Sequence, residues 1–278
     1  MASRPSLAFV YSIPIAIAGG LIGLGGAEFR LPVLVGPLQY PAKKAVPLNL
    51  VVSLMTLLSS FAIRGQAIPF VTLAPLADGI VAMIAGAVLA ALIGTALAGK
   101  VSEERLHKVV LFLLVTIGIG LIIEGFLPEQ FPALLPSTTI AHVVGGFVFG
   151  LGIGLVSSLL GVAGGELIIP TLVFAYGADI KIAGSASLLI SIPTVLVGVV
   201  RYAFRGGYSD RAVWSQTIIP MSFGSVLGAI LGGMLVGLVS SSVLKVVLGI
   251  ILYWSAFKIF RKRREPHQRG DKVASPSP

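Results

Sequence analysis

The sequence predicts an all-α polytopic membrane protein with about eight long transmembrane helices and two short re-entrant or broken segments, arranged as two inverted-topology repeats. Of its 278 residues, 56% are hydrophobic and only 11% are charged, whereas soluble domains carry about 25% charged residues. The apolar residues form long runs, and the two halves of the chain align with each other. The composition therefore excludes a water-soluble globular protein.

Eight apolar stretches approach the roughly 20 residues that a membrane-spanning helix needs. They cover residues 7–26, 45–63, 70–98, 107–126, 139–160, 182–200, 213–238 and 242–260. The first stretch is not expected to be a cleaved signal peptide, because it continues into a glycine cluster and lacks a convincing small-x-small exit. These stretches predict a helical bundle with almost no soluble mass.

Two further apolar stretches, 28–38 and 166–177, are shorter, and each follows a glycine cluster and contains a proline. A helix rises 1.5 Å per residue, so eleven or twelve residues extend about 17 Å, against a hydrocarbon core of roughly 30 Å. We expect each short stretch to be re-entrant, partly extended or part of a broken helix.

An internal repeat relates the two halves of the chain at an offset of 138 residues. GLGGAEFRLPVLV at 23–35 aligns without a gap with GVAGGELIIPTLV at 161–173, so Glu28 matches Glu166 and Pro32 matches Pro170. Hydrophobic composition alone would not match one glutamate with another. A fixed-offset similarity of this kind indicates a duplication, with one short and four long apolar segments in each half.

Positive residues predict the orientation, because Lys and Arg near helix ends stay on the cytoplasmic side of a membrane. With both termini inside and an odd number of crossings per half, 16 of the 20 basic residues lie inside. The four others are Arg30, Arg64, Lys181 and Lys245. The two halves would then have opposite orientations, which is the plan of many secondary transporters. Most of the net charge of +9 is thus explained as an orientation signal.

The predicted organisation is a first transmembrane repeat at 1–126, an extracytoplasmic linker at 127–138, a second repeat at 139–260 and a basic cytoplasmic tail at 261–278. Basic residues of the tail would lie beside anionic lipid, worth about 1 kcal/mol each, and a nucleic-acid arm is a weaker interpretation. The sequence contains no GxxxxGK[ST], HExxH or GxSxG motif, no cysteine and no metal-like histidine spacing. We therefore expect no enzyme activity, cofactor or metal.

Interrupted helices at corresponding positions of two inverted halves indicate a transport site. Here the interruptions contain Gly25 and Gly26 in the first half and Gly164 and Gly165 in the second. Glycine lets the backbone unwind, and the helix that resumes after the break offers its positive N-terminal end to an anion. The alternative is that these glycines only allow close helix packing.

Glu28 and Glu166 follow the two breaks, and an intramembrane carboxylate is a functional-site candidate by default. Each carboxyl could carry a coupling proton, or it could accept backbone N–H bonds at a helix N-terminus. Pro32 and Pro170 follow in the same short stretches and are assigned to gating with the glutamates.

Arg30 occurs only in the first half, since Ile168 stands at the matching position of the second. Its guanidinium could bind an oxyanion in a bidentate manner, or it could pair with an acid. Neutral hydrogen-bond donors are also predicted in the helices that follow the two breaks: Asn49, Ser53, Ser187 and Ser191. Such residues often bond instead to their own helix four residues back.

The duplicated motif reads GLGGAEFRLP with AVPLN in the first half and GVAGGELIIP with AGSAS in the second. It resembles the sulfite exporter TauE/SafE family over about residues 7–260. The resemblance implies a secondary transporter in the bacterial inner membrane that exports sulfite or an organosulfonate by alternating access, with proton coupling as an open possibility. In that family the residue after the glycines is often small or apolar, so Glu28 and Glu166 depart from its pattern.

Other interpretations remain open at this point. The chain could carry another small anion, work in the uptake direction, or be a non-transporting membrane scaffold. An intramembrane enzyme is disfavoured because no nucleophile and base pair stands out. The expected partners are a small sulfur-containing anion and membrane lipids, without nucleic acid, and a homo-oligomer is an open alternative.

Overall fold

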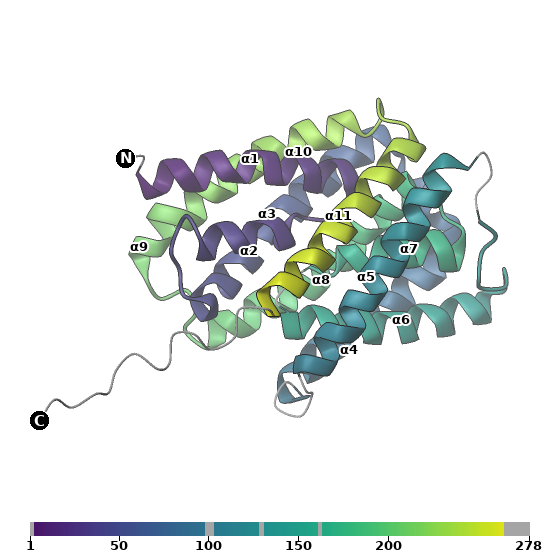
Figure 1. Cartoon of the computed structure of the whole chain (residues 1–278), viewed down its shortest axis with the longest axis horizontal. Coiled ribbons are helices and arrows are strands. Elements are labelled where there is room, and N and C mark those ends of the chain that lie inside the picture. The colour runs from purple at the N-terminus through teal and green to yellow at the C-terminus, as the bar shows by residue number, and fades with distance from the viewer. Residues whose placement is uncertain (1–2, 98–102, 128–130, 161–162, 264–278) are drawn as a thin grey trace, which may run out of the picture.

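The computed structural model describes residues 3–97, 103–127, 131–160 and 163–263, and the regular elements in these ranges are all helical (Figure 1). The first half contains α1 (Arg4–Ile22), α2 (Ala27–Val35), α3 (Ala42–Ala67), the 3-10 helix η1 (Phe70–Leu76), α4 (Ala77–Leu97) and α5 (Glu103–Phe126). The second half contains α6 (Thr139–Leu160), α7 (Gly165–Tyr176), α8 (Ile180–Phe204), α9 (Arg211–Val213), the π-helical turn η2 (Trp214–Ile218), α10 (Ile219–Leu235) and α11 (Ser241–Arg263). The predicted all-α class is confirmed.

Within the described ranges, six helices are long and apolar enough to cross a membrane. They are Arg4–Ile22, Lys43–Ala67, Phe70–Ile93, Thr139–Ser158, Ile180–Phe204 and Arg211–Leu235. Helices α5 and α11 contribute shorter apolar stretches, Leu114–Phe126 and Ser241–Ser255. The chain is thus a multi-pass membrane protein, and the number of eight spans remains a prediction.

The first short segment is a helix that turns back on α1. Gly23, Gly25 and Gly26 adopt φ angles of 99°, 75° and 72°, which glycine reaches without the steric cost that a Cβ imposes. After α2 the chain returns to the end at which α1 begins, because the Arg4 guanidinium lies 5.6 Å from the centre of the Tyr40 ring. Helices α1 and α2 therefore form a hairpin with a broken tip.

The second short segment repeats this arrangement with α6 and α7. Gly164 has a φ of 78° at the start of α7, and the Tyr176 hydroxyl at the end of α7 donates to the His142 carbonyl oxygen at 2.9 Å. The end of α7 therefore lies beside the beginning of α6. Both short segments are therefore helical and return beside the helix that precedes them, so the partly extended alternative does not apply.

Small residues allow the long helices to approach closely. Gly224 and Gly232 of α10 lie against Phe9 and Ile17 of α1, in that order along both helices. Gly79 and Met83 of α4 likewise lie against Gly146 and Gly150 of α6. The pairs α1 with α10 and α4 with α6 consequently run parallel, and they pack more extensively than any other pairs.

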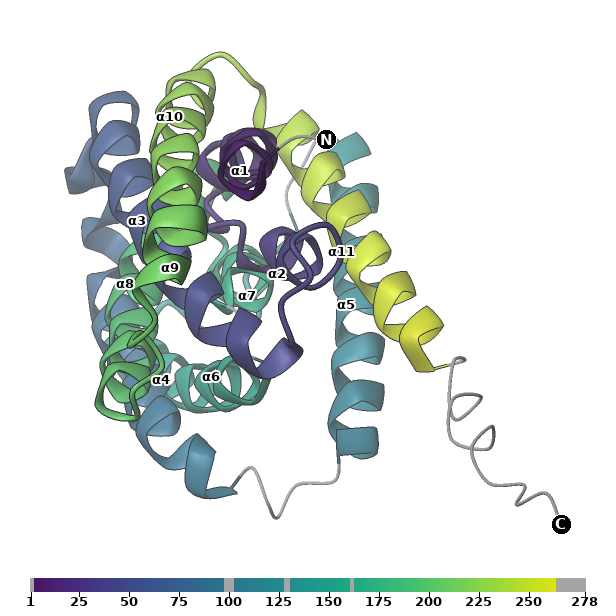
Figure 2. The same ribbon diagram turned by 90° about the vertical axis from the view of Figure 1, so that its left-hand side faces the viewer.

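Two other helix pairs run antiparallel. Gly118 of α5 lies against Leu252 of α11, whereas Gly125, further along α5, lies against the earlier Val246. Helices α3 and α8 also run antiparallel, since the end of α3 contacts the beginning of α8 through a hydrogen bond from Arg64 to the Lys181 carbonyl. Figure 2 shows α2 and α7 in the middle of the bundle, surrounded by the long helices.

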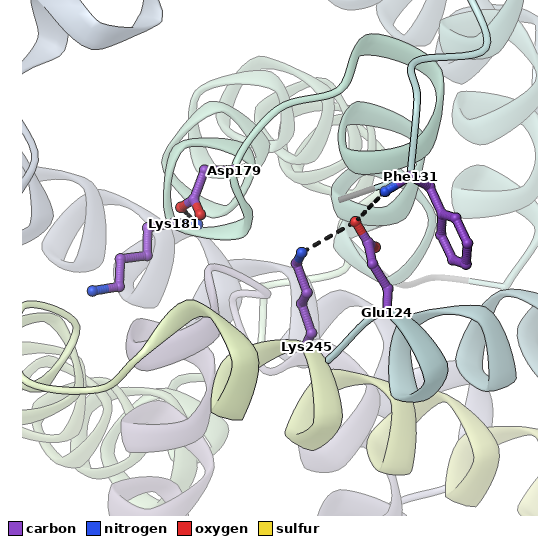
Figure 3. A network of polar contacts seen from close by, with 5 residues as sticks. All are labelled: Glu124, Phe131, Asp179, Lys181 and Lys245. Atoms are coloured by element: carbon purple, nitrogen blue, oxygen red, sulfur yellow. Dashed lines mark hydrogen bonds and ion pairs between the residues drawn. The ribbon is translucent and has the colours of Figure 1, made fainter. Parts of the chain in front are cut away.

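A buried ion pair joins α5 to α11 (Figure 3). The Nζ atom of Lys245 lies 3.1 Å from Oε1 of Glu124, and the two side chains are 6% and 2% exposed. The same carboxylate oxygen accepts the backbone N–H of Phe131 at 3.4 Å. Lys181 points away from this pair in Figure 3. Lys245, one of the four basic residues predicted to lie outside the cytoplasmic set, is thus neutralised within the bundle.

Breaking this pair on one side is expected to destabilise the protein by about 3–5 kcal/mol, because the remaining charge stays buried without its partner. Lys245→Met and Glu124→Leu should each lower the unfolding midpoint in detergent, whereas the double variant should recover most of the loss. Lys181→Met is the control, since it removes a lysine that lies outside the pair. Strictly additive losses in the double variant would contradict this prediction.

Candidate functional site

The two glycine breaks meet in the interior of the bundle. A Cβ atom placed on Gly165 would lie 3.1 Å from Cα of Leu24, and one on Gly23 would lie 2.6 Å from Cα of Gly184. Residues of both breaks are buried, which is where irregular backbone is tolerated at membrane depth. The predicted residues Gly25, Gly26, Gly164 and Gly165 therefore belong to one region, although the first pair is 138 residues or more from the second in the sequence.

Two helix N-termini begin at this meeting point. The residues that precede α2 and α7 are Gly26 and Gly164, and neither offers a side-chain hydrogen bond to the first turn. The first N–H groups of an α-helix have no partner within the helix. Because aligned peptide dipoles make this end positive, the site is suited to a negative charge.

Arg30 lies beside the first break and is fully buried, with 0% of its surface exposed. Its Nη1 donates to Ser53 Oγ at 2.8 Å, and its Nη2 donates to Thr56 Oγ1 at 2.9 Å. Longer contacts reach Ser225 Oγ at 3.4 Å and the Gly25 carbonyl at 3.5 Å. The Nε atom has no hydrogen-bond partner among the described residues.

The hydrogen-bond partners of this guanidinium in the described part of the chain are hydroxyl and carbonyl oxygens, with no carboxylate among them. A buried charge costs several kcal/mol unless a counter-charge and hydrogen bonds compensate for it. Arg30 is therefore a cation that hydroxyl groups hold in place and that an incoming anion could neutralise.

Glu28 is acted on electrostatically by both Glu166 and Arg30. Oε1 of Glu28 is buried and unpartnered within the described ranges, whereas Oε1 of Glu166 accepts a hydrogen bond from Ser255 of α11 at 2.9 Å. Helix α11 also contacts α2, because the Phe29 and Trp254 rings stack with their centres 6.4 Å apart. Helix α11 thus borders both short helices.

Pro32 and Pro170 lie inside α2 and α7, four residues after Glu28 and Glu166. A proline has no N–H group, so the main-chain carbonyl four residues earlier loses its helical hydrogen bond. In each short helix the carbonyl affected is that of the glutamate. In both halves of the chain, the turn that carries the glutamate therefore also lacks one main-chain hydrogen bond of the helix.

Two of the predicted neutral donors hydrogen-bond to main-chain carbonyls beside the breaks. Asn49 Nδ2 donates to the Ala27 carbonyl at 2.9 Å, and Ser191 Oγ donates to the Ala163 carbonyl at 3.2 Å. Ser53 accepts from Arg30, as described above. Ser187 Oγ is buried next to Gly165 and has no partner in the described residues. The contacts that the described residues show for Asn49, Ser53 and Ser191 are thus with the breaks or with Arg30, outside their own helices.

Sequence reasoning missed Thr56 and Ser225 as partners of Arg30. Thr56 carried a signal, because it matches Thr194 in the repeat. In the structure its hydroxyl accepts from Arg30 and donates to the Val52 carbonyl at 2.9 Å. Ser225 comes from α10, 195 residues away from Arg30, and nothing local in the sequence indicates that contact.

Arg64 is a second buried arginine that the sequence assigned no role. Its Nη1 donates to the carbonyls of Gly20 and Leu21 at 3.0 and 2.6 Å, and its Nη2 donates to the Lys181 carbonyl at 2.7 Å. Nε donates to Ser185 Oγ at 3.1 Å. A cation at the C-terminal end of α1 is favourable because that end of the helix dipole is negative. Arg64 thus joins α3, the first break and the beginning of α8.

Comparison with known proteins identifies one matching family. The family described as "Sulfite exporter TauE/SafE" matches residues 2–121 and 146–278, which include both breaks and both glutamates. Neither the comparison with curated proteins nor that with solved structures finds a match. Members of the matching family are membrane transporters and not enzymes. The chain, a multi-pass membrane protein with two broken helix hairpins, therefore belongs to the TauE/SafE sulfite exporter family of membrane transporters.

Proposed function

We propose that the protein exports sulfite or an organosulfonate across the bacterial cytoplasmic membrane by alternating access, with Arg30 as the principal anion ligand. One observation carries this proposal: a fully buried guanidinium, with hydroxyl and carbonyl oxygens as its hydrogen-bond partners in the described residues, lies beside the first of two helix breaks that contact each other.

The substrate class follows from the chemistry of the site. A guanidinium presents parallel N–H donors that match two oxygens of an oxyanion, and Arg30 has an unused Nε. The hydroxyl group of Ser187 and the first N–H groups of α2 and α7 are further neutral donors for the remaining oxygen. Neutral donors around a single cation suit a small anion of low charge, such as hydrogen sulfite or a sulfonate.

The packing of the helices supports an inverted repeat. In the duplication, α3 corresponds to α8 and α5 to α11, and each of these pairs runs antiparallel. The contact of α1 with α10 corresponds to that of α6 with α4, and both are parallel. A two-fold relation in the membrane plane would give this pattern, and rocking of one half against the other would expose the central site alternately.

We further propose that both termini are cytoplasmic and that Glu28 and Glu166 share the coupling proton. The orientation rests on the bias of Lys and Arg toward the termini and the loops of that side. The coupling rests on two carboxyl groups close enough to repel each other, one of which has an unpartnered buried oxygen. Two such groups bind one proton more readily than either would alone.

The purified protein in liposomes should show saturable flux of radiolabelled sulfite that unlabelled sulfite or sulfoacetate suppresses. Acetate and phosphate at the same concentration show whether the suppression of sulfite flux is specific to sulfur oxyanions. The absence of saturable flux for any sulfur oxyanion would refute the proposed substrate, and flux of acetate or phosphate at the same rate would assign the protein to another anion.

Glu28→Gln is expected to separate exchange from coupling, because the amide keeps the size of the side chain but cannot carry a proton. A pH difference of one unit can sustain about a tenfold anion gradient at one proton per anion. Wild-type liposomes should approach that gradient, whereas Glu28→Gln should exchange sulfite at equal pH and accumulate none. Glu166→Gln should behave in the same way, and unchanged accumulation in both variants would exclude these carboxyls as the coupling groups.

A further inference from the structure

A basic vestibule lies at the end of the molecule that carries the N-terminus. It is a cavity of about 440 Å³, lined by the beginning of α3, the loop after α8 and the turn from α9 into η2. Its charged wall residues are Lys43, Lys44, Arg205 and Asp210. Figure 1 places α9 at the same end as the N-terminus. The volume is within the range of roughly 300–1,000 Å³ that is typical of small-molecule sites.

The wall of the vestibule is held by hydrogen bonds between its own residues. The Trp214 indole donates to the Tyr208 carbonyl at 2.9 Å, and the Tyr208 hydroxyl donates to the Pro47 carbonyl at 3.1 Å. Burial, and secondarily the neighbouring Tyr202, raises the pKa of Tyr208 above its usual value. The phenol therefore stays neutral at physiological pH and does not offset the three cations.

A smaller cavity of about 60 Å³ shares the lining residues Tyr202 and Arg205 with the vestibule. It is also lined by the buried residues Ser157 and Thr194. Ser157 lies beside the second glycine break, since a Cβ placed on Gly164 would be 3.4 Å from the Ser157 Cβ. The two cavities therefore trace a route from the basic end of the molecule to the break that precedes α7.

We propose that this vestibule is an anion-loading site, in which Lys43, Lys44 and Arg205 collect a small oxyanion and direct it past Tyr202 toward Gly164. This inference rests on the proposed function and adds the face and the residues through which the anion enters. Three cations against the single carboxylate of Asp210 leave the wall with a net positive charge. A cleft with an excess of one sign of charge concentrates counter-ions and accelerates their binding by about 10- to 1,000-fold, in a way that salt weakens.

The vestibule contains a tryptophan whose fluorescence can report on anions in the cavity. The chain has two tryptophans, and only Trp214 lines the cavity, so Trp254→Phe leaves a single fluorophore at the site. In that background, iodide should quench fluorescence about two- to fivefold more strongly than caesium at low salt, as the focused potential predicts. Acrylamide measures accessibility without charge. The excess quenching by iodide should vanish near 1 M salt, where the Debye length is about 3 Å.

The combined substitutions Lys43→Gln, Lys44→Gln and Arg205→Gln should remove the excess quenching by iodide and leave quenching by acrylamide unchanged. Lys181→Gln is the control for position, because it removes one positive charge at the opposite end of α8 from Arg205. Equal quenching by iodide in the wild type and the triple variant would overturn the proposal, as would an equal effect of Lys181→Gln.

Transport distinguishes a substrate anion from a lipid phosphate, which has similar chemistry. In zwitterionic liposomes at low salt, the triple variant should raise the KM for sulfite about five- to tenfold and change the maximal rate little. If sulfite KM is unchanged and anionic phosphatidylglycerol alone abolishes the iodide excess, the vestibule holds lipid and the proposal is wrong. The quenching measurement does not depend on transport. If iodide still quenches more strongly than caesium but no sulfite flux is found, the proposed function is refuted while the anion site in the vestibule is retained.

Discussion

Arg30→Met is expected to abolish sulfite transport while the protein stays at least as stable as the wild type. The guanidinium is fully buried, its hydrogen bonds in the described residues go to hydroxyl and carbonyl oxygens, and Glu28 attracts it electrostatically without hydrogen-bonding to it. The cost of burying its charge is therefore only partly compensated until an anion binds. Methionine fills similar apolar volume without that charge. Loss of a buried, hydrogen-bonded charge contact to a ligand costs about 2–5 kcal/mol, which lowers affinity by about 30-fold or more.

Two measurements test this separation of stability from function. Sulfite flux should fall to the background of empty liposomes, and the thermal midpoint in detergent should not fall. A ligand at about 100 times its Kd stabilises a protein by about 2.7 kcal/mol, so sulfite should raise the midpoint of the wild type but not that of Arg30→Met. Arg30→Lys should retain weak binding, because it keeps the charge but loses the planar fork.

Arg64→Met is the matched control, since it removes the second buried arginine. Its guanidinium bonds to main-chain carbonyls, and these lose their donors in the variant. An unsatisfied buried acceptor costs about 1–3 kcal/mol, so Arg64→Met should lower the thermal midpoint. Wild-type sulfite flux in Arg30→Met, or a larger loss of stability there than in Arg64→Met, would contradict the role assigned to Arg30.

Gly23→Ala is expected to prevent folding or to cost more than about 3 kcal/mol. The left-handed φ of 99° alone costs a residue with a Cβ about 1–2 kcal/mol. The added Cβ would also lie 2.6 Å from Cα of Gly184, which is backbone of the other half and cannot rotate away. Overpacking of this kind typically adds about 1–3 kcal/mol.

Gly164→Ala separates the two costs. Its φ of 78° is also left-handed, but the nearest atom to the added Cβ would be a side-chain methyl of Ile153 at 3.2 Å. Only the backbone cost of about 1–2 kcal/mol is then expected. Gly152→Ala, which meets nothing within 4 Å, should be neutral or slightly stabilising because alanine favours helix. Size-exclusion profiles and thermal unfolding in detergent should rank the three variants in this order, and an equal loss for Gly23 and Gly164 would contradict it.

The position of the breaks could be predicted from the sequence because their causes are local. A glycine pair stands shortly before each of Glu28 and Glu166, and Gly26 matches Gly164 and Glu28 matches Glu166 at an offset of 138 residues. These patterns indicate interruptions in both halves. The short helices extend over Ala27–Val35 and Gly165–Tyr176, close to the predicted 28–38 and 166–177. Their return beside α1 and α6 depended on contacts, such as that of Arg4 with Tyr40, that no local pattern reveals.

The partners of the charged residues were beyond prediction for the same reason. Arg30 was identified as a ligand candidate, but its contacts with Thr56 and Ser225 join three different helices. Glu124 and Lys245 each appeared alone in the sequence, and the antiparallel packing of α5 and α11 brings them together. A uniformly apolar helix surface does not specify which neighbour it meets.

The sequence alone determined the membrane class and the position of the two breaks, because apolar length and glycine content act over short stretches of chain. Only the tertiary structure decided which helices pack together, that the two breaks meet, and that Arg30 is surrounded by hydroxyl groups while Lys245 has a carboxylate. The physical reason is that small residues permit close approach anywhere along a helix, whereas the cost of a buried charge depends on the groups that folding places around it.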